Sequence, residues 1–217
     1  YYGALGVGSL ETGTGSREII NAMLYLNRFK TTQLIKNILK WFSSLITKPE
    51  NPYSSGTLMS RMAKEKYIAF NSEAYKSGLK QFEENISDVL KKINEAKIPV
   101  IISTVASNIK DQPPFVSTKY KSYSAQNVYN EAIPFYNQGN FKKADSLFRF
   151  AKDLDGLRFR APEEINSIIR KLSKIYNIPY IDVDSFFSSI SPNHIIGNNL
   201  MTDHLHPTLR GYQLIGK

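Results

Sequence analysis

The sequence predicts an α/β protein with a doubly wound parallel sheet and an inserted helical hairpin. A helical stripe followed by Ile-Pro and a short apolar run occurs at residues 71–105 and again at residues 162–183. Between these units, residues 123–156 have the pattern of two antiparallel helices. Because a helix that leads into a buried strand is half of a parallel crossover unit, two such units predict a parallel sheet with ligands at the carboxyl ends of its strands.

The composition favours a folded domain and excludes cysteine chemistry. Of 217 residues 41% are hydrophobic, which is ordinary for a globular protein, and the absence of cysteine excludes disulfides and thiolate metal sites. The net charge of +9 suggests an anionic partner. The lysines and arginines are spread over separate predicted helices between core positions, however, so we expect a solvated basic surface and no nucleic-acid partner.

Two loops and an apolar helical stretch precede the first unit. Residues 1–16 contain five glycines and predict a loop, in which Tyr1 and Tyr2 either line a substrate pocket or pack at the end of the domain. Residues 17–46 have apolar positions at helical spacing, with a break or a new helix start predicted at Thr31-Thr32. This stretch forms a lid, faces a membrane or is buried against the domain. Residues 48–57 predict a second loop.

The first unit consists of a helix and a buried strand. Asn71 is the predicted N-cap, and apolar residues keep a helical stripe as far as Ala96. The run from Ile98 to Val105 has the composition of a strand that is buried on both faces, with Pro99 tolerated at its start.

The insertion resembles a tetratricopeptide repeat, with small residues where two helices touch and aromatic residues between them. The positions that carry this resemblance are Ala132, Phe135, Gly139, Phe141, Ala144, Phe148 and Ala151, and Gly156 stands at the closing position. One repeat cannot bury its own face, so the hairpin should pack on the α/β part. Docking of a peptide and a purely structural role both remain open.

The second unit repeats the first. Pro162 is well placed to begin a helix, and residues 178–183 form the second strand. Asn108 and Asp184 follow the two strands. Asn108 is either an amide that faces the substrate or a residue that forms a turn.

Two arginines lead from the insertion to the second unit. Arg158 and Arg160 flank Phe159, and they either clamp a substrate carboxylate or phosphate or pair with acidic neighbours at positions 153, 155 and 163. Both are therefore candidate substrate contacts.

The segment near the carboxyl end carries the strongest catalytic pattern. Asp203 lies three residues before His206, which is followed by Pro207. A carboxylate at this spacing can hold one imidazole nitrogen and leave the other free to accept a proton. Pro207 and the apolar spacing after it predict a helix that starts there and places His206 at its amino end. A capped helix with a surface histidine is the simpler alternative.

The pattern Asp203-x-x-His206-Pro207, followed by Gly211-Tyr212, resembles the last conserved block of the SGNH/GDSL hydrolases. In that family the aspartate and histidine complete a triad with a serine far upstream. The resemblance implies a three-layer flavodoxin-like fold and hydrolysis of acyl or carbohydrate esters, with Asp203 and His206 as catalytic residues.

Two further stretches extend the resemblance. Residues 1–6 resemble the segment that follows the family's Gly-x-Asn block, whose asparagine lines the oxyanion hole. Residues 107–115 resemble a loop in a membrane-associated or secreted branch that carries a tetratricopeptide-like insertion. The expected parts are therefore an α/β part over residues 1–122, the insertion over residues 123–156 and a second α/β part over residues 157–217.

The family's nucleophile has no counterpart in this sequence. Ser146 follows Ala-Asp but falls inside a predicted helix, and Ser185 follows a strand too close to Asp203 to be the first-strand serine. We therefore expect a fragment of a serine ester hydrolase whose nucleophile, second-block glycine and asparagine precede Tyr1. We also expect the last helix to be cut at Lys217.

The implied mechanism needs no cofactor and no metal. We expect a small-molecule or glycan ester as substrate, an extracytoplasmic or membrane-anchored parent with possible peripheral membrane association, and a homodimer through an exposed sheet edge. The alternative function is a scaffold without catalysis that binds a peptide through the hairpin. A weaker alternative is a basic protein that binds anionic surfaces.

Overall fold

The computed structural model describes residue 22, residues 25–46 and residues 67–216. They fall into two compact units, one containing residues 67–216 and the other the described residues up to 46. Tyr1, Tyr2 and the loops predicted at residues 1–16 and 48–57 lie outside the described residues.

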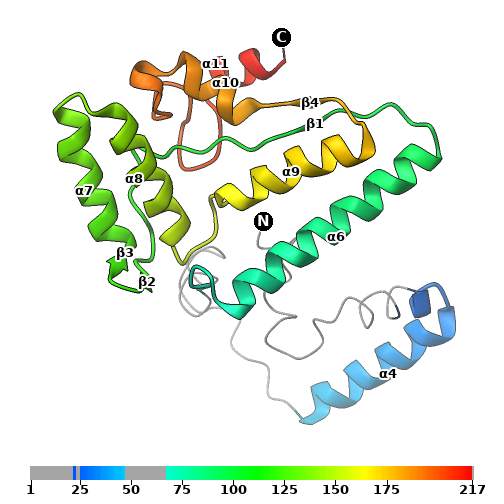
Figure 1. Ribbon diagram of the computed structural model, residues 1–217. Helices are drawn as coiled ribbons and strands as arrows, with labels where there is room; N and C mark the ends of the chain where they lie inside the picture. Colours follow the sequence, from blue (N-terminus) through cyan, green and yellow to red (C-terminus); the bar gives the residue numbers. More distant parts are fainter. Residues whose placement is uncertain (1–21, 23–24, 47–66, 217) are drawn as a thin grey trace. The chain divides into compact units, whose positions relative to one another are not determined.

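The larger unit is built around two parallel strands. They are β1 (Ile102–Ser103) and β4 (Tyr180–Ile181), with Ile102 opposite Tyr180 and Ser103 opposite Ile181. Helix α6 (Glu73–Glu95) precedes β1, and α9 (Glu163–Tyr176) precedes β4. In Figure 1, α6 and α9 lie on one side of the strands, and α10 (Val183–Ile190) and α11 (Leu209–Ile215) lie on the other. The fold is mixed α/β, mostly helical with a small parallel sheet, and is consistent with part of the expected three-layer fold.

The strands predicted at residues 98–105 and 178–183 are shorter than expected, and the prediction that the first is buried on both faces is wrong. Each parallel strand has two paired residues, and the ladder has no third strand among the described residues. Ile98, Ile101 and Val105 are 57%, 64% and 44% exposed. The apolar runs were read as buried because of their composition, but a ladder of this length leaves their side chains uncovered.

Both long helices of this unit begin with identifiable caps. Ser72, and not the predicted Asn71, caps α6, because its Oγ accepts a hydrogen bond from the Tyr75 N–H. Pro162 directly precedes α9, as predicted, and α9 ends at Asn177 in the left-handed conformation. The two helices pack through a buried layer that consists of Leu90, Leu172 and Ile178 and a second that consists of Ala161, Ile165 and Ile169.

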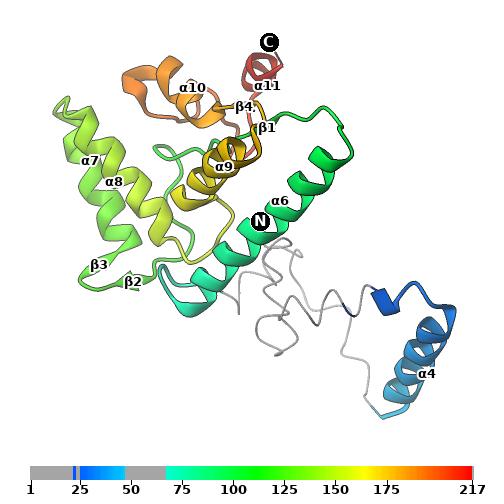
Figure 2. The same ribbon diagram turned by 45° about the vertical axis from the view of Figure 1, so that its right-hand side comes forward.

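The predicted helical hairpin is present and packs on the α/β part. It consists of α7 (Ala125–Asn137) and α8 (Phe141–Leu154), which lie side by side in Figure 2. It follows a short antiparallel pair, β2 (Lys119–Tyr120) and β3 (Tyr123–Ser124). Ala132, Ala144 and Phe148 are buried in one cluster with residues 195, 196, 200 and 201. The hairpin is therefore part of the larger compact unit.

An ion-pair network joins the hairpin to the second helix–strand unit. The Arg149 guanidinium on α8 contacts Asp145 on the same helix, Glu163 at the start of α9 and Asp184 at the start of α10, at 3.1, 3.1 and 3.0 Å. Lys152 adds a contact of 2.7 Å to Glu163. These contacts fix α8 against both later helices.

The smaller unit contains α4 (Lys30–Ile46). A turn at residues 27–29 precedes it, so the predicted break at Thr31-Thr32 is misplaced and both threonines lie in the first turn of the helix. Within the part of the chain that the structure describes, no helix is long and apolar enough to cross a bilayer.

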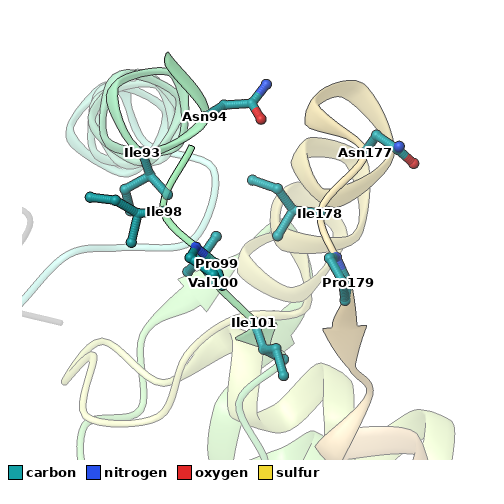
Figure 3. A pocket seen from close by; sticks show the side chains of 9 residues that line it. All are labelled: Ile93, Asn94, Ile98, Pro99, Val100, Ile101, Asn177, Ile178 and Pro179. Atoms are coloured by element: carbon teal, nitrogen blue, oxygen red, sulfur yellow. The ribbon is translucent and has the colours of Figure 1, made fainter. Parts of the chain in front are cut away.

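A hollow of about 590 Å³ opens at the amino ends of β1 and β4 (Figure 3). Its lining is apolar apart from two amides and contains no ionisable side chain. The residues that line it are Ile93, Asn94, Ile98, Pro99, Val100, Ile101, Asn177, Ile178 and Pro179. Such a surface has no group for acid–base chemistry.

Candidate active site

The Asp203–His206 segment forms a closed loop. Met201 and Pro207 form an antiparallel bridge, and the Thr202 N–H donates to the His206 carbonyl oxygen at 2.8 Å. The Thr208 N–H donates to the Leu200 carbonyl oxygen, also at 2.8 Å. Since both ends of the loop are tied together, the residues between them are held close in space.

Within this loop the carboxylate and the imidazole are in contact. Asp203 Oδ2 lies 2.7 Å from His206 Nδ1, and Oδ1 accepts hydrogen bonds from the N–H groups of Leu205 and His206 at 2.9 and 2.8 Å. The imidazole side chain is 62% exposed. Nε2 has no hydrogen-bond partner among residues 67–216, so it is open to a group from outside this loop.

The Asp203 carboxylate is stabilised in its charged form. Partial burial alone would raise the pKa of Asp203, but the N–H groups of Leu205 and His206, together with the His206 ring, lower it to about 2. Asp203 is therefore ionised at neutral pH. An ionised partner at Nδ1 fixes the tautomer in which Nε2 accepts a proton.

The helix after the loop starts later than predicted. Thr208 caps α11, because its Oγ1 accepts from the Gly211 N–H at 3.1 Å, and the helix begins at Leu209. Pro207 therefore precedes the cap and does not form the first turn. The helix ends at Ile215 with Gly216 as its C-cap, so the helix expected to continue through the end of the sequence stops before it.

Gly211 allows α11 to approach the loop closely. A Cβ atom at this position would lie 2.7 Å from the Leu200 carbonyl oxygen and 2.8 Å from Pro207 Cβ. Both distances are shorter than real Cβ contacts, so any larger side chain would displace the helix or the loop.

His204 anchors the loop to the segment that follows β1. Its carbonyl oxygen accepts from the Asn108 N–H at 3.0 Å, and its ring stacks on Phe115 with the centroids 3.8 Å apart. Phe159 packs edge-on against Phe115. Burial and the nearby Arg160 charge lower the pKa of His204, which favours the neutral ring. His204 thus holds the loop, whereas His206 is exposed.

Asn108 is buried and forms a turn. Its Oδ1 accepts from the Asp111 N–H at 3.0 Å, and its Nδ2 donates to Asn198 Oδ1 at 2.8 Å. Both ends of the amide therefore bond to the protein. Of the two roles predicted for Asn108, the geometry favours the turn.

Arg160 is directed into the interior of the larger unit. It contacts Asp155 at 3.1 Å and donates to the carbonyl oxygens of Asn108 and Gln112 at 3.0 and 2.7 Å. Its side chain and that of Asp155 are each 2% exposed. The acidic pairing predicted as the alternative to a substrate contact is the arrangement seen. Arg160 therefore fixes the backbone of the segment after β1, which contacts His204.

Arg158 is buried as well. Its guanidinium donates to the Ile68 and Asp153 carbonyl oxygens and lies over the Tyr75 ring, 4.8 Å from the centroid. A clamp on a substrate would need an accessible guanidinium. In this structure the predicted clamp is therefore replaced by contacts that tie α6 to the end of the hairpin.

Asp155 was predicted only as an acidic neighbour of the two arginines, and Phe115 had no predicted role in the site. The two carboxylate oxygens of Asp155 accept from the N–H groups of Phe115 and Val116 at 3.0 Å each, in addition to the contact with Arg160. The only signal was that residues 107–115 and 155–160 each contained a candidate site residue. Nothing in the sequence pairs them.

The two serines considered as substitutes lie in helices. Ser146 is in the middle of α8, where its hydroxyl donates to the Lys142 carbonyl oxygen at 3.0 Å, and Ser185 is in the first turn of α10. Neither occupies a turn between a strand and a helix. Over residues 22, 25–46 and 67–216, no three histidine or acidic side chains are grouped so as to hold a metal ion.

Comparison with known proteins identifies the family. Residues 69–217 match the GDSL-like Lipase/Acylhydrolase family, and the match includes the hairpin and the Asp203–His206 loop. No curated protein and no solved structure matches the chain significantly. The comparison gives no support for a branch with a tetratricopeptide-like insertion. Since the matched segment covers well over half of the sequence, the chain belongs to the GDSL-like lipase/acylhydrolase family, whose members act on ester bonds.

Proposed function

We propose that this chain supplies the acid–base part of a serine ester hydrolase. The observation that carries the proposal is the contact of 2.7 Å between Asp203 Oδ2 and His206 Nδ1, with the imidazole exposed. An imidazole that is held at one nitrogen and open at the other is the arrangement that activates a hydroxyl nucleophile.

In the proposed reaction His206 moves one proton in each direction. Nε2 accepts the proton of a serine hydroxyl while the serine oxygen attacks the acyl carbon of the ester. The imidazolium then gives this proton to the leaving alcohol, and an acyl-serine ester remains. Water repeats the sequence and releases the acid. Asp203 stays ionised throughout, because its pKa is about 2, and stabilises the imidazolium.

The serine itself is proposed to come from the part of the protein before Tyr1. The 217-residue sequence contains no Gly-Asp-Ser block, and Ser146 and Ser185 are placed in helices. The oxyanion donors, a glycine N–H and an asparagine amide, are assigned to the same upstream part by the family resemblance. On this basis we expect residues 1–217 to show no ester hydrolysis when this upstream part is missing.

The hairpin is proposed to be structural. The small residues at its helix contact, Ala132 and Ala144, are fully buried, and Phe148 fills the space beside them. These side chains are packed within the larger unit, so a peptide would have to bind to a different face of the hairpin. This favours the hydrolase over the scaffold.

The test uses a longer protein that includes the upstream block. We expect it to hydrolyse p-nitrophenyl acetate and to lose at least about 10³-fold in kcat/KM on His206→Ala. His194→Ala is the matched control, because His194 is also exposed but lies outside the loop, and it should keep full activity. A protein of residues 1–217 should show no turnover above its own His206→Ala variant. Equal activity of the longer protein and its His206→Ala variant would refute the proposal.

A further inference from the structure

Helix α4 has a wide apolar face that is exposed in the smaller unit. At 100° per residue, its large apolar residues fall within an arc of about 160°. Six described side chains on this arc are 45–62% exposed, and they are Leu34, Ile35, Ile38, Leu39, Trp41 and Phe42. Tyr25, Leu26 and Phe29, which precede the helix, are also exposed.

The charged side chains of the helix are all basic. The 17 residues of α4 include three lysines and no aspartate or glutamate. Lys36 lies across the helix from the apolar arc, and its Nζ contacts Asn27 Oδ1 at 2.6 Å in the preceding turn. The helix is therefore both strongly amphipathic and purely cationic.

These two properties together fit a lipid surface better than a protein groove. A helix that lies in a membrane interface has an apolar face, lysines on its polar face and aromatic residues at the boundary. Trp41 and Phe42 form an edge-to-face pair on the apolar arc. The helix is too polar to span a bilayer, which agrees with the absence of a spanning helix among the described residues.

We propose that α4 binds in the plane of an anionic phospholipid membrane, with its apolar face among the acyl chains and its lysines at the headgroups. Charge complementarity selects this partner, because the helix carries only positive charges and the whole chain has a net charge of +9. The proposal does not depend on the esterase assignment, and it would localise the larger unit at a membrane surface.

The single tryptophan makes the proposal directly testable. Trp41 is the only tryptophan in the sequence, so the fluorescence of the whole chain reports on α4. On addition of vesicles of equimolar phosphatidylglycerol and phosphatidylcholine, we expect its emission to shift to shorter wavelength. Lipids brominated on their acyl chains should quench it, and the protein should sediment with the vesicles.

Two variants separate the apolar and charge contributions. Leu39→Glu/Phe42→Glu should reduce vesicle partitioning by at least about tenfold and abolish the shift. Lys30→Glu/Lys36→Glu, which alters only exposed positions, should reduce partitioning to anionic vesicles by about tenfold or more. The matched control is Lys119→Glu/Lys121→Glu, because it makes the same charge change at exposed positions on and next to β2 and should bind almost as the wild type.

Several outcomes would overturn the proposal. One is a Trp41 emission wavelength that does not change when anionic vesicles are added. Another is an equal loss of vesicle binding in the control and in the Lys30→Glu/Lys36→Glu variant. A third is quenching of Trp41 only by lipids brominated in the headgroup region. Equal binding to vesicles of phosphatidylcholine alone would reject the role of charge. Burial of α4 against protein would appear as a blue-shifted emission before lipid is added.

Discussion

At the carboxyl ends of β1 and β4 polar side chains are buried and bonded, whereas at the amino ends of the same strands apolar side chains are exposed. Thr104, 2% exposed, donates to Asp182 Oδ1 at 2.9 Å and accepts from the Asp184 N–H at 3.1 Å. Ile98 and Ile101, at the other end, are more than half exposed. Burial of polar groups is costly unless they are bonded, so the carboxyl end is the part of the strand pair in which geometry is fixed.

The Asp203–His206 loop is attached to the carboxyl end of the strand pair, where the geometry is fixed. It is joined through His204 to the segment after β1, and that segment is held by the buried pair of Arg160 and Asp155. The exposed apolar end has no such chain of contacts. We therefore expect substitutions of the buried polar residues at the carboxyl end to have large effects and those of the exposed apolar residues at the amino end to have small ones.

The largest effect is expected for Asp203→Asn. The amide cannot hold the imidazole in the reactive tautomer, so ester hydrolysis by the longer protein should fall by about 10⁴-fold, far more than any loss of stability explains. Steady-state kinetics and a thermal melt measure the two quantities. Glu131→Gln, at an exposed carboxylate on α7, is the control. A loss of less than tenfold in ester hydrolysis would show that Asp203 does not take part in catalysis.

Arg160→Met should have the next largest effect, on stability. It leaves the buried Asp155 carboxylate without its charged partner and several carbonyl oxygens without a donor, so the free energy of unfolding should fall by about 3–5 kcal/mol. Urea denaturation measures this change. Arg210→Met, at an exposed arginine on α11, should stay within about 0.5 kcal/mol. Similar losses in the two variants would contradict the role given to Arg160.

Asp182 should control the acid limb of the stability profile. Hydrogen bonds from Arg170 are the main cause that lowers the pKa of Asp182 below its ordinary value. The pair of Asp182 and Arg170 therefore makes its full contribution to the free energy of unfolding above the pKa of Asp182 in the unfolded chain, which is about 4. This contribution is lost as the pH falls toward the lower pKa of Asp182 in the folded protein. Asp182→Asn should remove about 1.5–3 kcal/mol at pH 7 and flatten the loss below pH 4. An unchanged acid limb would reject this assignment.

The smallest effect is expected at the apolar end. Ile101→Val should change the free energy of unfolding by less than about 0.5 kcal/mol, whereas Ile165→Val, at a buried position, should cost about 0.5–1.5 kcal/mol. Urea denaturation of both variants tests the contrast. A cost at Ile101 equal to that at Ile165 would mean that the exposed end is covered in solution, as in the homodimer proposed through the sheet edge.

The sequence predicts well the features that depend on local spacing. The helical stripes of α6 and α9 are long enough to be recognised, and Pro162 marks the start of α9. The contact of Asp203 with His206 spans three residues within one closed loop, so its spacing alone was informative. The hairpin was also predictable, because its small and aromatic residues alternate at helical intervals, and the structure contains it.

Features that depend on distant partners were not predictable. The length of β1 is set by its pairing with β4, and composition alone suggested a longer, covered strand. The stacking of Phe115 on His204 and the binding of the segment after β1 by Asp155 join residues far apart in the chain. A substrate contact and an acidic partner were both predicted for Arg160, because its charge was visible in the sequence whereas its burial was not.

Gly211 has a consequence for natural and designed variation. Helix α11 touches the histidine loop at a point where one extra methyl group would collide with backbone and proline atoms. Alanine, normally the mildest replacement in a helix, is therefore a severe one at this position. A saturation library at position 211 of the catalytically competent protein should accept glycine alone, although Gly211 has no side chain that could react.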